Sequence, residues 1–480
     1  MSGKPPDESL EWLFHPRSIA AVGISDRKPH LRELFLDSQR YMGYEGQLYA
    51  VTARGEPVAD YPSFKRLTDI PEPVDHVIIT VPAARIREVL EDCAAKNVRS
   101  VHAFTSGFGE SDDPRGRALQ DDIEAWIKKQ SFRFIGPNCM GLYCPETGLA
   151  FRPDFIRERG AIGYVSQSGG MAITGIFMAG AKMLYFSKAV SYGNEADLRC
   201  SELLRYLSAD SATELVWAYI EGTRSGGELL AAMREVCRKK PLLVLKGGLT
   251  DSGGRAVASH TGAMAGASRV WTNAIRQTGA IMVESLEELV DSTMALRWLP
   301  AGSGNRLGVA CISGGLSVNY TDQAIRAGFR VPAMSKELVG VLKKTIDLPG
   351  TSLNNPLDLA AGFFQFREFP QIFGTIDESG EIDAMIMVLA LEYLPVHESR
   401  SKYPDLHKLA GRLFQTCRDE MKCPFLVVMP PVLHDEIRLK FEREFLKAHI
   451  PTYPSIHRAL KALGNWKLYH RLGSSRMPNS

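Results

Sequence analysis

The stretch GAIGYVSQSGGMAI, residues 160–173, contains the pattern that decides the fold. A short apolar run ends in a turn of serine and glycine, and the turn leads into a segment of helical character. An apolar strand that passes through a small-residue turn into a helix is typical of a βαβ unit. SIAAVGISD (residues 18–26) and RLGVACISGGLSVNY (residues 306–320) repeat the pattern. The sequence therefore predicts an α/β protein with three doubly wound, parallel-sheet domains.

Further apolar runs around these turns supply the remaining strands. The first region offers residues 47–51, 76–81, 100–105 and 133–135, the second AIGYVSQ, FSKAVSYG, ELVWAYIEG and PLLVLKGG, and the third LGVACISGG, DAMIMVLAL and PFLVVMP. This alternation predicts a Rossmann-like domain followed by two flavodoxin-like domains. The pattern is interrupted near residues 145–158 and by a Gly/Pro-rich linker at 298–305. We expect domains at 1–148, 149–300 and 301–470, and a disordered tail at 471–480.

The overall composition excludes several classes of function. The 57 basic residues nearly balance the 55 acidic ones, so no long-range field attracts nucleic acid or an anionic membrane. No apolar run is long enough for a signal peptide or a membrane span. The eight cysteines lack the close pairs of zinc or redox motifs. We expect a cytoplasmic protein without a metal site, a nucleic-acid partner or a membrane partner.

Two of the strand-to-helix turns have the chemistry of a phosphate site. Small residues let the main chain approach an anion, and the start of the following helix presents unpaired N–H groups and a partial positive charge. These glycines could instead only tighten the turn, but two nearly matching SGG turns in one chain favour phosphate. The candidate phosphate-binding residues are Ser166, Gln167, Ser168, Gly169 and Gly170 in the first turn and Ser313, Gly314 and Gly315 in the second.

The amino-terminal region differs, because the turn VGISDRKPHL has a single glycine, Gly23. A dinucleotide fingerprint needs G-x-G-x-x-G, so an NAD-dependent dehydrogenase is disfavoured. Ser25, Arg27 and Lys28 either hold a pyrophosphate or form a solvated loop. The turns VPAA, TSGFGE and GPNCMG follow other strands of this domain and are expected on the same edge, which suits an extended, nucleotide-like ligand. They contain Val81, Pro82, Ser106, Gly107, Asn138 and Cys139.

One histidine, His260, lies in the small-residue stretch ASHTGAMAG, residues 258–266. Most lone histidines are surface or structural residues, but small and hydroxyl-bearing neighbours leave space around this imidazole. Imidazole is a competent nucleophile near neutral pH and accepts a proton or a phosphoryl group. Glu221, at the end of the strand WAYIEG, is the candidate carboxylate that orients it, although a strand-end glutamate is often only solvated.

The strings VSQSGG, GNEADL, YIEG, KGG and SHTGAMAG, with GPNC upstream and NNPLDL downstream, resemble the NDP-forming acyl-CoA synthetases. This group contains the ADP-forming acetyl-CoA synthetases and belongs to the succinyl-CoA synthetase superfamily. The likeness covers residues 10–465 and implies a CoA-binding Rossmann-like domain followed by two flavodoxin-like CoA-ligase domains. It also implies a reaction in which a carboxylic acid, CoA and a nucleoside triphosphate give acyl-CoA, nucleoside diphosphate and phosphate through an acyl phosphate and a phosphohistidine.

The resemblance assigns roles to the residues singled out above. His260 falls on the phosphohistidine and Glu221 on the glutamate that orients it, while the two SGG turns match the helix N-termini that bind the phosphate. The residues that match the CoA loops are Gly23, Ser25, Val81, Pro82, Asn138 and Cys139.

The chain departs from the family in two places. ISDRKPHLRELF lacks the family's S-x-x-P-x-x-x-G pattern, and VTARGEPVADYPSF lacks the usual VNP loop. An altered CoA pocket leaves open a non-catalytic CoA-binding or regulatory homologue with the same fold.

The chain also has no room for an ATP-grasp module after residue 300. We therefore expect an alpha-type subunit that depends on a separate beta-type ATP-grasp partner for ATP or GTP and Mg²⁺. The expected assembly is a homodimer or a heterotetramer, acting on a small carboxylic acid.

Overall fold

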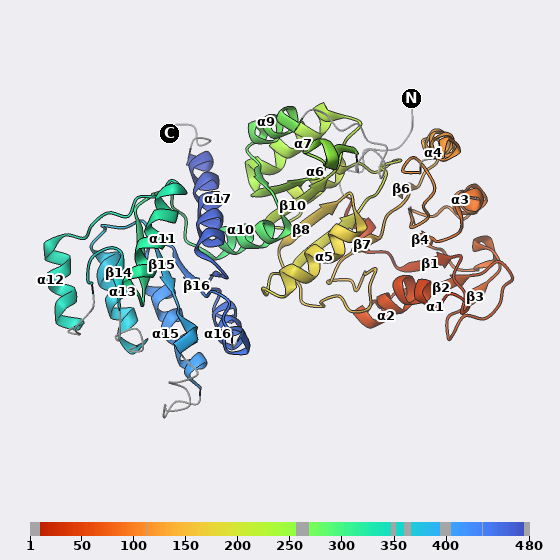
Figure 1. Cartoon of the computed structure of the whole chain (residues 1–480). Helices are drawn as coiled ribbons and strands as arrows, with labels where there is room; N and C mark the ends of the chain where they lie inside the picture. The colour runs from red at the N-terminus through yellow and green to blue at the C-terminus, as the bar shows by residue number, and fades with distance from the viewer. Residues whose placement is uncertain are drawn as a thin grey trace. The chain divides into compact units, whose positions relative to one another are not determined.

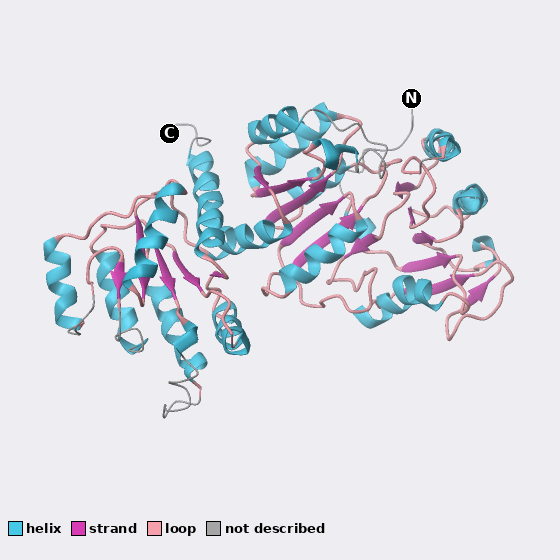
Figure 2. Ribbon diagram, viewed as in Figure 1, coloured by secondary structure: helices cyan, strands magenta, loops and turns pink. Residues whose placement is uncertain are grey.

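The computed structural model describes residues 10–111, 113–255, 268–346, 352–359, 366–393, 405–433 and 435–474. Their strands form three sheets (Figure 1), each flanked by helices (Figure 2). The chain divides into two compact units, Met1–Leu286 with the first two sheets and Glu287–Ser480 with the third.

The first sheet is entirely parallel and has the strand order β3-β2-β1-β4-β5-β6. This is the Rossmann order, in which ligands bind at the carboxyl ends of the two central strands, here β1 and β4. The strands are β1 Ser18–Val22, β2 Gln47–Val51, β3 Ser63–Phe64, β4 His76–Ile79, β5 Ser100–Ala103 and β6 Arg133–Ile135. The helices are α1 Pro29–Arg32, α2 Ser38–Met42, α3 Ile86–Ala95 and α4 Pro114–Ile127, with a π-helical turn Glu33–Asp37 between α1 and α2 and short 3-10 turns at Glu11–Phe14, Leu67–Asp69 and Ala83–Arg85.

The second sheet has the order β12-β11-β10-β8-β9-β7, in which β7 alone is antiparallel to its neighbour. Without β7 the order is that of flavodoxin, with the switch point between β8 and β10. The strands are β7 Gly141–Tyr143, β8 Ile162–Ser166, β9 Phe186–Ser191, β10 Leu215–Ile220, β11 Leu242–Lys246 and β12 Ile281–Val283. The helices are α5 Gly169–Gly180, α6 Cys200–Ala209, α7 Gly226–Lys239 and α9 Ser268–Thr278.

The third sheet is parallel, and its order β14-β13-β15-β16-β17 is again that of flavodoxin. The strands are β13 Leu307–Cys311, β14 Leu357–Asp358, β15 Ala384–Val388, β16 Phe425–Val428 and β17 Thr452–Tyr453. The helices are α10 Leu286–Trp298, α11 Gly314–Arg326, α12 Lys336–Thr345, α13 Phe369–Glu378, α15 Leu406–Glu420, α16 Asp435–Lys447 and α17 Ile456–Ser474, with 3-10 turns at Phe366–Glu368 and Leu391–Tyr393.

The elements follow from the apolar pattern of the sequence. Central strands such as β11 (LLVLK) are buried along their whole length, as expected where helices cover both faces of a parallel sheet. Helix α7 buries Leu229, Ala232, Met233, Val236 and Cys237, which form one stripe at helical spacing. The predicted α/β class, with one Rossmann-like and two flavodoxin-like sheets, is therefore confirmed.

The structure adds strands that the sequence did not predict, namely β3, β7, β12, β14 and β17, each of two or three residues. Helix α17 continues to Ser474, into the predicted tail, and residues 475–480 lie outside the described ranges. The predicted domain boundaries stay predictions. Among the described helices, none is both long enough and apolar enough to cross a membrane.

Candidate functional site

The first SGG turn, residues 168–170, connects β8 to α5. Ser168 is the N-cap of α5, and its Oγ accepts a hydrogen bond from the Met171 N–H at 3.3 Å. The Ser166 hydroxyl donates to the carbonyl oxygen of Ser168 at 2.7 Å, which fixes the turn from inside. Gly170 is exposed, and a methyl group there would meet nothing nearer than the Ser168 Oγ at 3.9 Å. The first turn of α5 is thus open to an anion at the positive end of the helix.

Gln167 brings the first SGG turn and Glu221 together. The two residues follow β8 and β10, which are neighbours in the sheet. The Oε1 of Gln167 accepts hydrogen bonds from the N–H groups of Glu221 at 2.8 Å and Gly222 at 3.1 Å. The Gln167 side chain is buried and holds the main chain of Glu221, while its predicted role in phosphate binding stays a prediction.

Two residues that the sequence analysis did not assign also hold Glu221. Tyr219 donates its hydroxyl to the Glu221 Oε1 at 3.0 Å. The Lys246 ammonium donates to the carbonyl oxygens of Glu221, at 2.7 Å, and of Gly247, and lies 4.8 Å from the centre of the Trp271 ring. Burial lowers the pKa of Lys246 to about 8, although Glu221 acts in the opposite direction. The sequence signal that could have identified Lys246 was its position at the end of the apolar strand PLLVLKGG.

His260 lies outside the described residues, and so does the rest of ASHTGAMAG. Its role, and its expected place beside Glu221, therefore stay predictions.

The second SGG turn, residues 313–315, connects β13 to α11 in the other unit. Ser313 is the N-cap of α11, but its side chain makes no capping hydrogen bond. Its carbonyl oxygen accepts from the Ser317 hydroxyl at 3.1 Å and from the Cys311 thiol at 3.3 Å. A methyl group at Gly314 would lie 3.2 Å from the Oδ2 of Asp358. A carboxylate therefore lies beside this helix N-terminus.

The predicted CoA turns meet at the carboxyl edge of the first sheet. Gly23 has φ +94°, and a methyl group there would lie 2.8 Å from the Thr80 Oγ1 and 2.9 Å from a Val81 methyl. The Thr105 hydroxyl donates to the Val81 carbonyl oxygen at 2.7 Å, and the Asn138 N–H donates to the Thr105 carbonyl oxygen at 2.9 Å. Hydrogen bonds and contacts thus join the ends of β1, β4, β5 and β6 into one continuous edge.

The candidate residues on this edge differ in exposure. Val81 and Cys139 are buried, Gly23, Ser25 and Asn138 are half-buried, and Arg27, Lys28, Pro82, Ser106 and Gly107 are exposed. The Cys139 thiol donates to the carbonyl oxygens of Ala103 and Ile135 at 3.5 and 3.6 Å, and burial raises its pKa. The thiol therefore stays neutral and faces the interior, which leaves Asn138 as the more exposed residue of that turn.

The CoA edge and the first SGG turn are in contact. Met140, which follows the GPNC turn, packs so closely against Gly169 that a methyl group on this glycine would lie 2.5 Å from the Met140 Cγ. The Met140 N–H donates to the Ser191 Oγ at 3.1 Å, and the Asn194 N–H donates to the Pro137 carbonyl oxygen at 3.0 Å. The candidate CoA edge and the first SGG turn are therefore in direct contact within the first unit.

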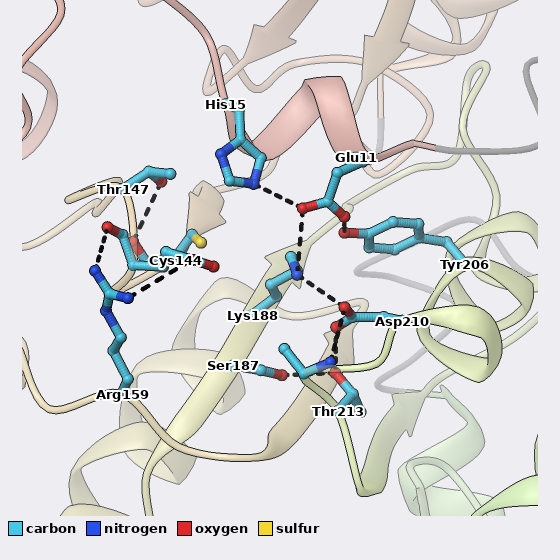
Figure 3. A network of polar contacts seen from close by, with 12 residues as sticks. Glu11, His15, Cys144, Thr147, Arg159, Ser187, Lys188, Tyr206, Asp210 and Thr213 are labelled. Carbon is cyan, nitrogen blue, oxygen red and sulfur yellow. Dashed lines mark hydrogen bonds and ion pairs between the residues drawn. The ribbon is translucent and has the colours of Figure 1, made fainter.

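A second polar network joins the amino-terminal turn Glu11–Phe14 to the second sheet (Figure 3). The buried Lys188 ammonium lies 3.1 Å from the Asp210 Oδ1 and 3.7 Å from the Glu11 Oε1. The other carboxylate oxygen of Glu11 accepts from the Tyr206 hydroxyl, while His15 lies 2.6 Å from its Oε1. This network contains no predicted site residue, and it ties the first two sheets of the unit together.

A cavity of about 620 Å³ opens near His15, lined also by residues 42–46, 145–148, 157 and 159. None of the predicted site residues lines it. In the part of the chain that the structure describes, no three His, Cys, Asp or Glu side chains are grouped as metal ligands would be.

Comparison with known families supports the predicted domain types of both sheets of the first unit. Residues 17–145 match a CoA binding domain, and residues 159–296 match a succinyl-CoA ligase like flavodoxin domain.

Relatives resemble the chain over most of its length. The alpha subunit of acetate–CoA ligase (ADP-forming) II from Pyrococcus furiosus is 31% identical, over 73% of this chain and 76% of the relative. The alpha subunit of ligase I from the same organism is 29% identical, over 96% and 99%. The dinucleotide-forming acetyl-coenzyme A synthetase 1 of Ca. Korarchaeum cryptofilum, solved with phosphate and ADP, superimposes with a TM-score of 0.82 at 25% identity, covering 98% of this chain and all of that chain. The chain belongs to the family of ADP-forming (NDP-forming) acyl-CoA synthetases and corresponds to their alpha-type chain.

Proposed function

We propose that the chain is the alpha-type subunit of an NDP-forming acyl-CoA synthetase, which converts a small carboxylic acid, CoA and a nucleoside triphosphate to acyl-CoA, nucleoside diphosphate and phosphate. One observation carries the proposal most directly: Gln167 ties the open first turn of α5 to Glu221, while Met140 packs the same turn against the candidate CoA edge. A helix N-terminus open to an anion, a carboxylate and the candidate CoA edge thus lie within one unit.

The proposed chemistry passes the phosphoryl group through His260. A ring nitrogen of His260 attacks the γ-phosphorus and the nucleoside diphosphate leaves. The carboxylate oxygen of the acid then takes the phosphoryl group from the histidine, and the CoA sulfur attacks the acyl phosphate, loses its proton and displaces phosphate. Glu221 orients the imidazole, and the N–H groups of the SGG turns stabilise the phosphoryl oxygens. The acid, CoA and nucleotide supply every group that is transferred.

We further propose a separate beta-type ATP-grasp subunit that carries the nucleotide and Mg²⁺, in a heterotetramer or a homodimer-based assembly. The two relatives from Pyrococcus furiosus support a partner, because both are named as alpha subunits. All eight cysteines are free thiols, which supports a reducing cytoplasmic location.

Incubation with the beta-type partner, labelled ATP and Mg²⁺ tests the proposal. The wild-type chain should form an acid-labile, base-stable phosphoenzyme, and His260→Ala should not. Glu221→Gln should label more slowly than the wild type. Label that persists in His260→Ala contradicts the proposal.

The glycine-poor first turn favours a second candidate, a CoA-binding regulatory homologue. Arg27 lies 3.5 Å from Glu56, so its guanidinium already has a protein partner in a loop where the family has additional glycines. Calorimetry distinguishes the two candidates, because CoA binding without phosphorylation in the presence of the partner subunit identifies the regulator.

A further inference from the structure

The Glu110 carboxylate organises the exposed turn that contains Ser106 and Gly107. Its Oε1 accepts hydrogen bonds from the N–H groups of Gly107 at 2.6 Å and Phe108 at 3.3 Å. Gly107 has φ +102°, so the main chain here adopts a conformation that favours glycine. The Glu110 carboxylate therefore fixes two main-chain N–H groups of this candidate CoA turn.

The other oxygen of Glu110 reaches across to the second sheet. Its Oε2 accepts from the Nδ2 of Asn194, in the loop after β9, at 2.6 Å. The same Nδ2 donates to the Gln120 Oε1 at 3.0 Å, and this oxygen also accepts from the Gly109 N–H at 2.9 Å. Asn194 and Gln120 are 6% and 2% exposed, so water cannot readily replace these bonds.

Helix α4 extends the contacts to the loop after Glu221. The Gln120 Nε2 donates to the Glu124 Oε1 at 2.8 Å. The Arg224 guanidinium then binds both oxygens of Glu124, at 2.6 and 2.7 Å. Arg224 is three residues after Glu221. An unbroken polar chain, formed by Glu110, Asn194, Gln120, Glu124 and Arg224, thus connects the Ser106–Gly107 turn to the loop that carries the candidate catalytic glutamate.

We propose that Glu110 is a positioning residue for CoA binding, and that this polar chain couples the CoA turn to the Glu221 loop. The inference rests on the proposed function, because it assumes that the Ser106–Gly107 turn binds CoA. Glu110 acts through the two main-chain N–H groups that it fixes. Removing a charged acceptor from such groups weakens the geometry that they support, and buried hydrogen bonds in series respond to one another.

Glu110→Gln and Arg224→Met test the two ends of the polar chain. In Glu110→Gln, one oxygen can still accept from Gly107, but the new amide N–H group opposes the donor of Asn194. We expect the Kd for CoA, measured by calorimetry on the full chain, to rise roughly tenfold, as for loss of a charged hydrogen bond. We expect Arg224→Met, at the far end, to raise it about threefold. Glu91→Gln is the matched control, because Glu91 is exposed and pairs with Arg87 on the same helix.

The double variant tests the coupling. If both residues act through one chain, Glu110→Gln combined with Arg224→Met should bind CoA about as weakly as Glu110→Gln alone. Effects that simply multiply would overturn the coupling.

A readout with the partner subunit separates positioning from general loss of structure. Glu110→Gln should raise the KM for CoA by a larger factor than it slows phosphoenzyme formation without CoA, because the Glu221 loop lies at the far end of the polar chain. Equal losses in both would indicate a general defect and would overturn the inference.

Two further outcomes separate the inference from the proposed function. Wild-type-like CoA binding by Glu110→Gln overturns the inference and leaves the proposed function standing. Failure of the wild-type chain itself to bind CoA rejects both.

Discussion

The two SGG turns have the same local sequence and different surroundings. In the first turn Ser168 caps its own helix, and the preceding Gln167 clasps the main chain at Glu221. In the second turn Ser313 makes no side-chain cap, the preceding residue is the apolar Ile312, and the carboxylate of Asp358 lies beside Gly314. The first turn is therefore fixed by its own serine side chain and tied by Gln167 to the main chain of Glu221, whereas the Asp358 carboxylate lies directly beside the second turn. We therefore expect the phosphate affinity of a turn to depend on its neighbours as well as on its glycines.

The largest expected effect is on the pH dependence of stability, and it concerns Lys246, which holds Glu221 beside the first turn. Burial lowers its pKa from 10.5 to about 8. Below pH 8 the lysine is charged in both the folded and unfolded states, whereas between pH 8 and 10.5 the unfolded chain binds a proton that the folded chain has released. The free energy of unfolding of the wild type should therefore rise with pH relative to Lys246→Met, by about 3 kcal/mol in total.

Urea unfolding at several pH values, with the exposed Lys239→Met as control, measures this difference. Parallel pH profiles for the wild type and Lys246→Met would show that the lysine is not perturbed.

Removing the hydrogen bonds between Gln167 and the main chain should have the next largest effect on the free energy of unfolding. Gln167→Ala leaves the N–H groups of Glu221 and Gly222 without their acceptor, which should lower the free energy of unfolding by about 2 kcal/mol. The yield of phosphoenzyme should fall as well, since the carboxylate beside the turn loses its anchor. Gln323→Ala, which replaces a half-buried glutamine on α11, is the control in denaturant unfolding. Equal stability of Gln167→Ala and Gln323→Ala would show that Gln167 does not stabilise the main chain at Glu221.

Alanine substitutions at Gly169 and Gly315 test how tightly each of the two turns is packed. Gly169→Ala places a methyl group 2.5 Å from Met140 and should destabilise the fold by about 1 kcal/mol. Gly315→Ala meets nothing nearer than the Ser313 Oγ at 4.0 Å and should stabilise the chain by about 0.5 kcal/mol. Thermal unfolding of both variants measures the two changes in stability, which should have opposite signs. Changes of the same sign would show that the two turns do not differ in packing at these positions.

The smallest expected effect tests the charge at the second turn. Asp358→Asn removes a negative charge beside the N-terminus of α11, which should lower the free energy of unfolding by about 0.5 kcal/mol. Inorganic phosphate should bind two- to threefold more tightly, which titration calorimetry measures, at roughly the same energy scale. Asp322→Asn, farther along the same helix, should change neither quantity. Unchanged phosphate binding in Asp358→Asn would show that this carboxylate does not oppose an anion there.

Much of the fold was predictable because the central strands are uninterrupted apolar runs that end at small residues. LLVLK and AMIMV are strands of the parallel sheets, as predicted. The short strands were not predictable, because two or three residues carry no periodicity and pair only when longer strands are already in place. Antiparallel β7 shows this most clearly, since Gly141–Tyr143 joins the second sheet directly after the turn that ends the first.

The candidate site divides in the same way. The sequence identified Glu221 and the two SGG turns from residue type and position after a strand. It gave no role to Lys246, Tyr219 or Glu110, because their importance lies in contacts with residues distant in the sequence.

The sequence by itself determined the doubly wound α/β architecture, the position of the glycine turns and the likeness to acyl-CoA synthetases, because apolar periodicity and short motifs are local properties. Only the tertiary structure decided which carboxylates lie near each turn, and which side chains hold Glu221 and the candidate CoA turn. Those properties depend on the order of strands in each sheet and on the packing between the two sheets of the first unit, which brings together groups as far apart in sequence as Glu124 and Arg224.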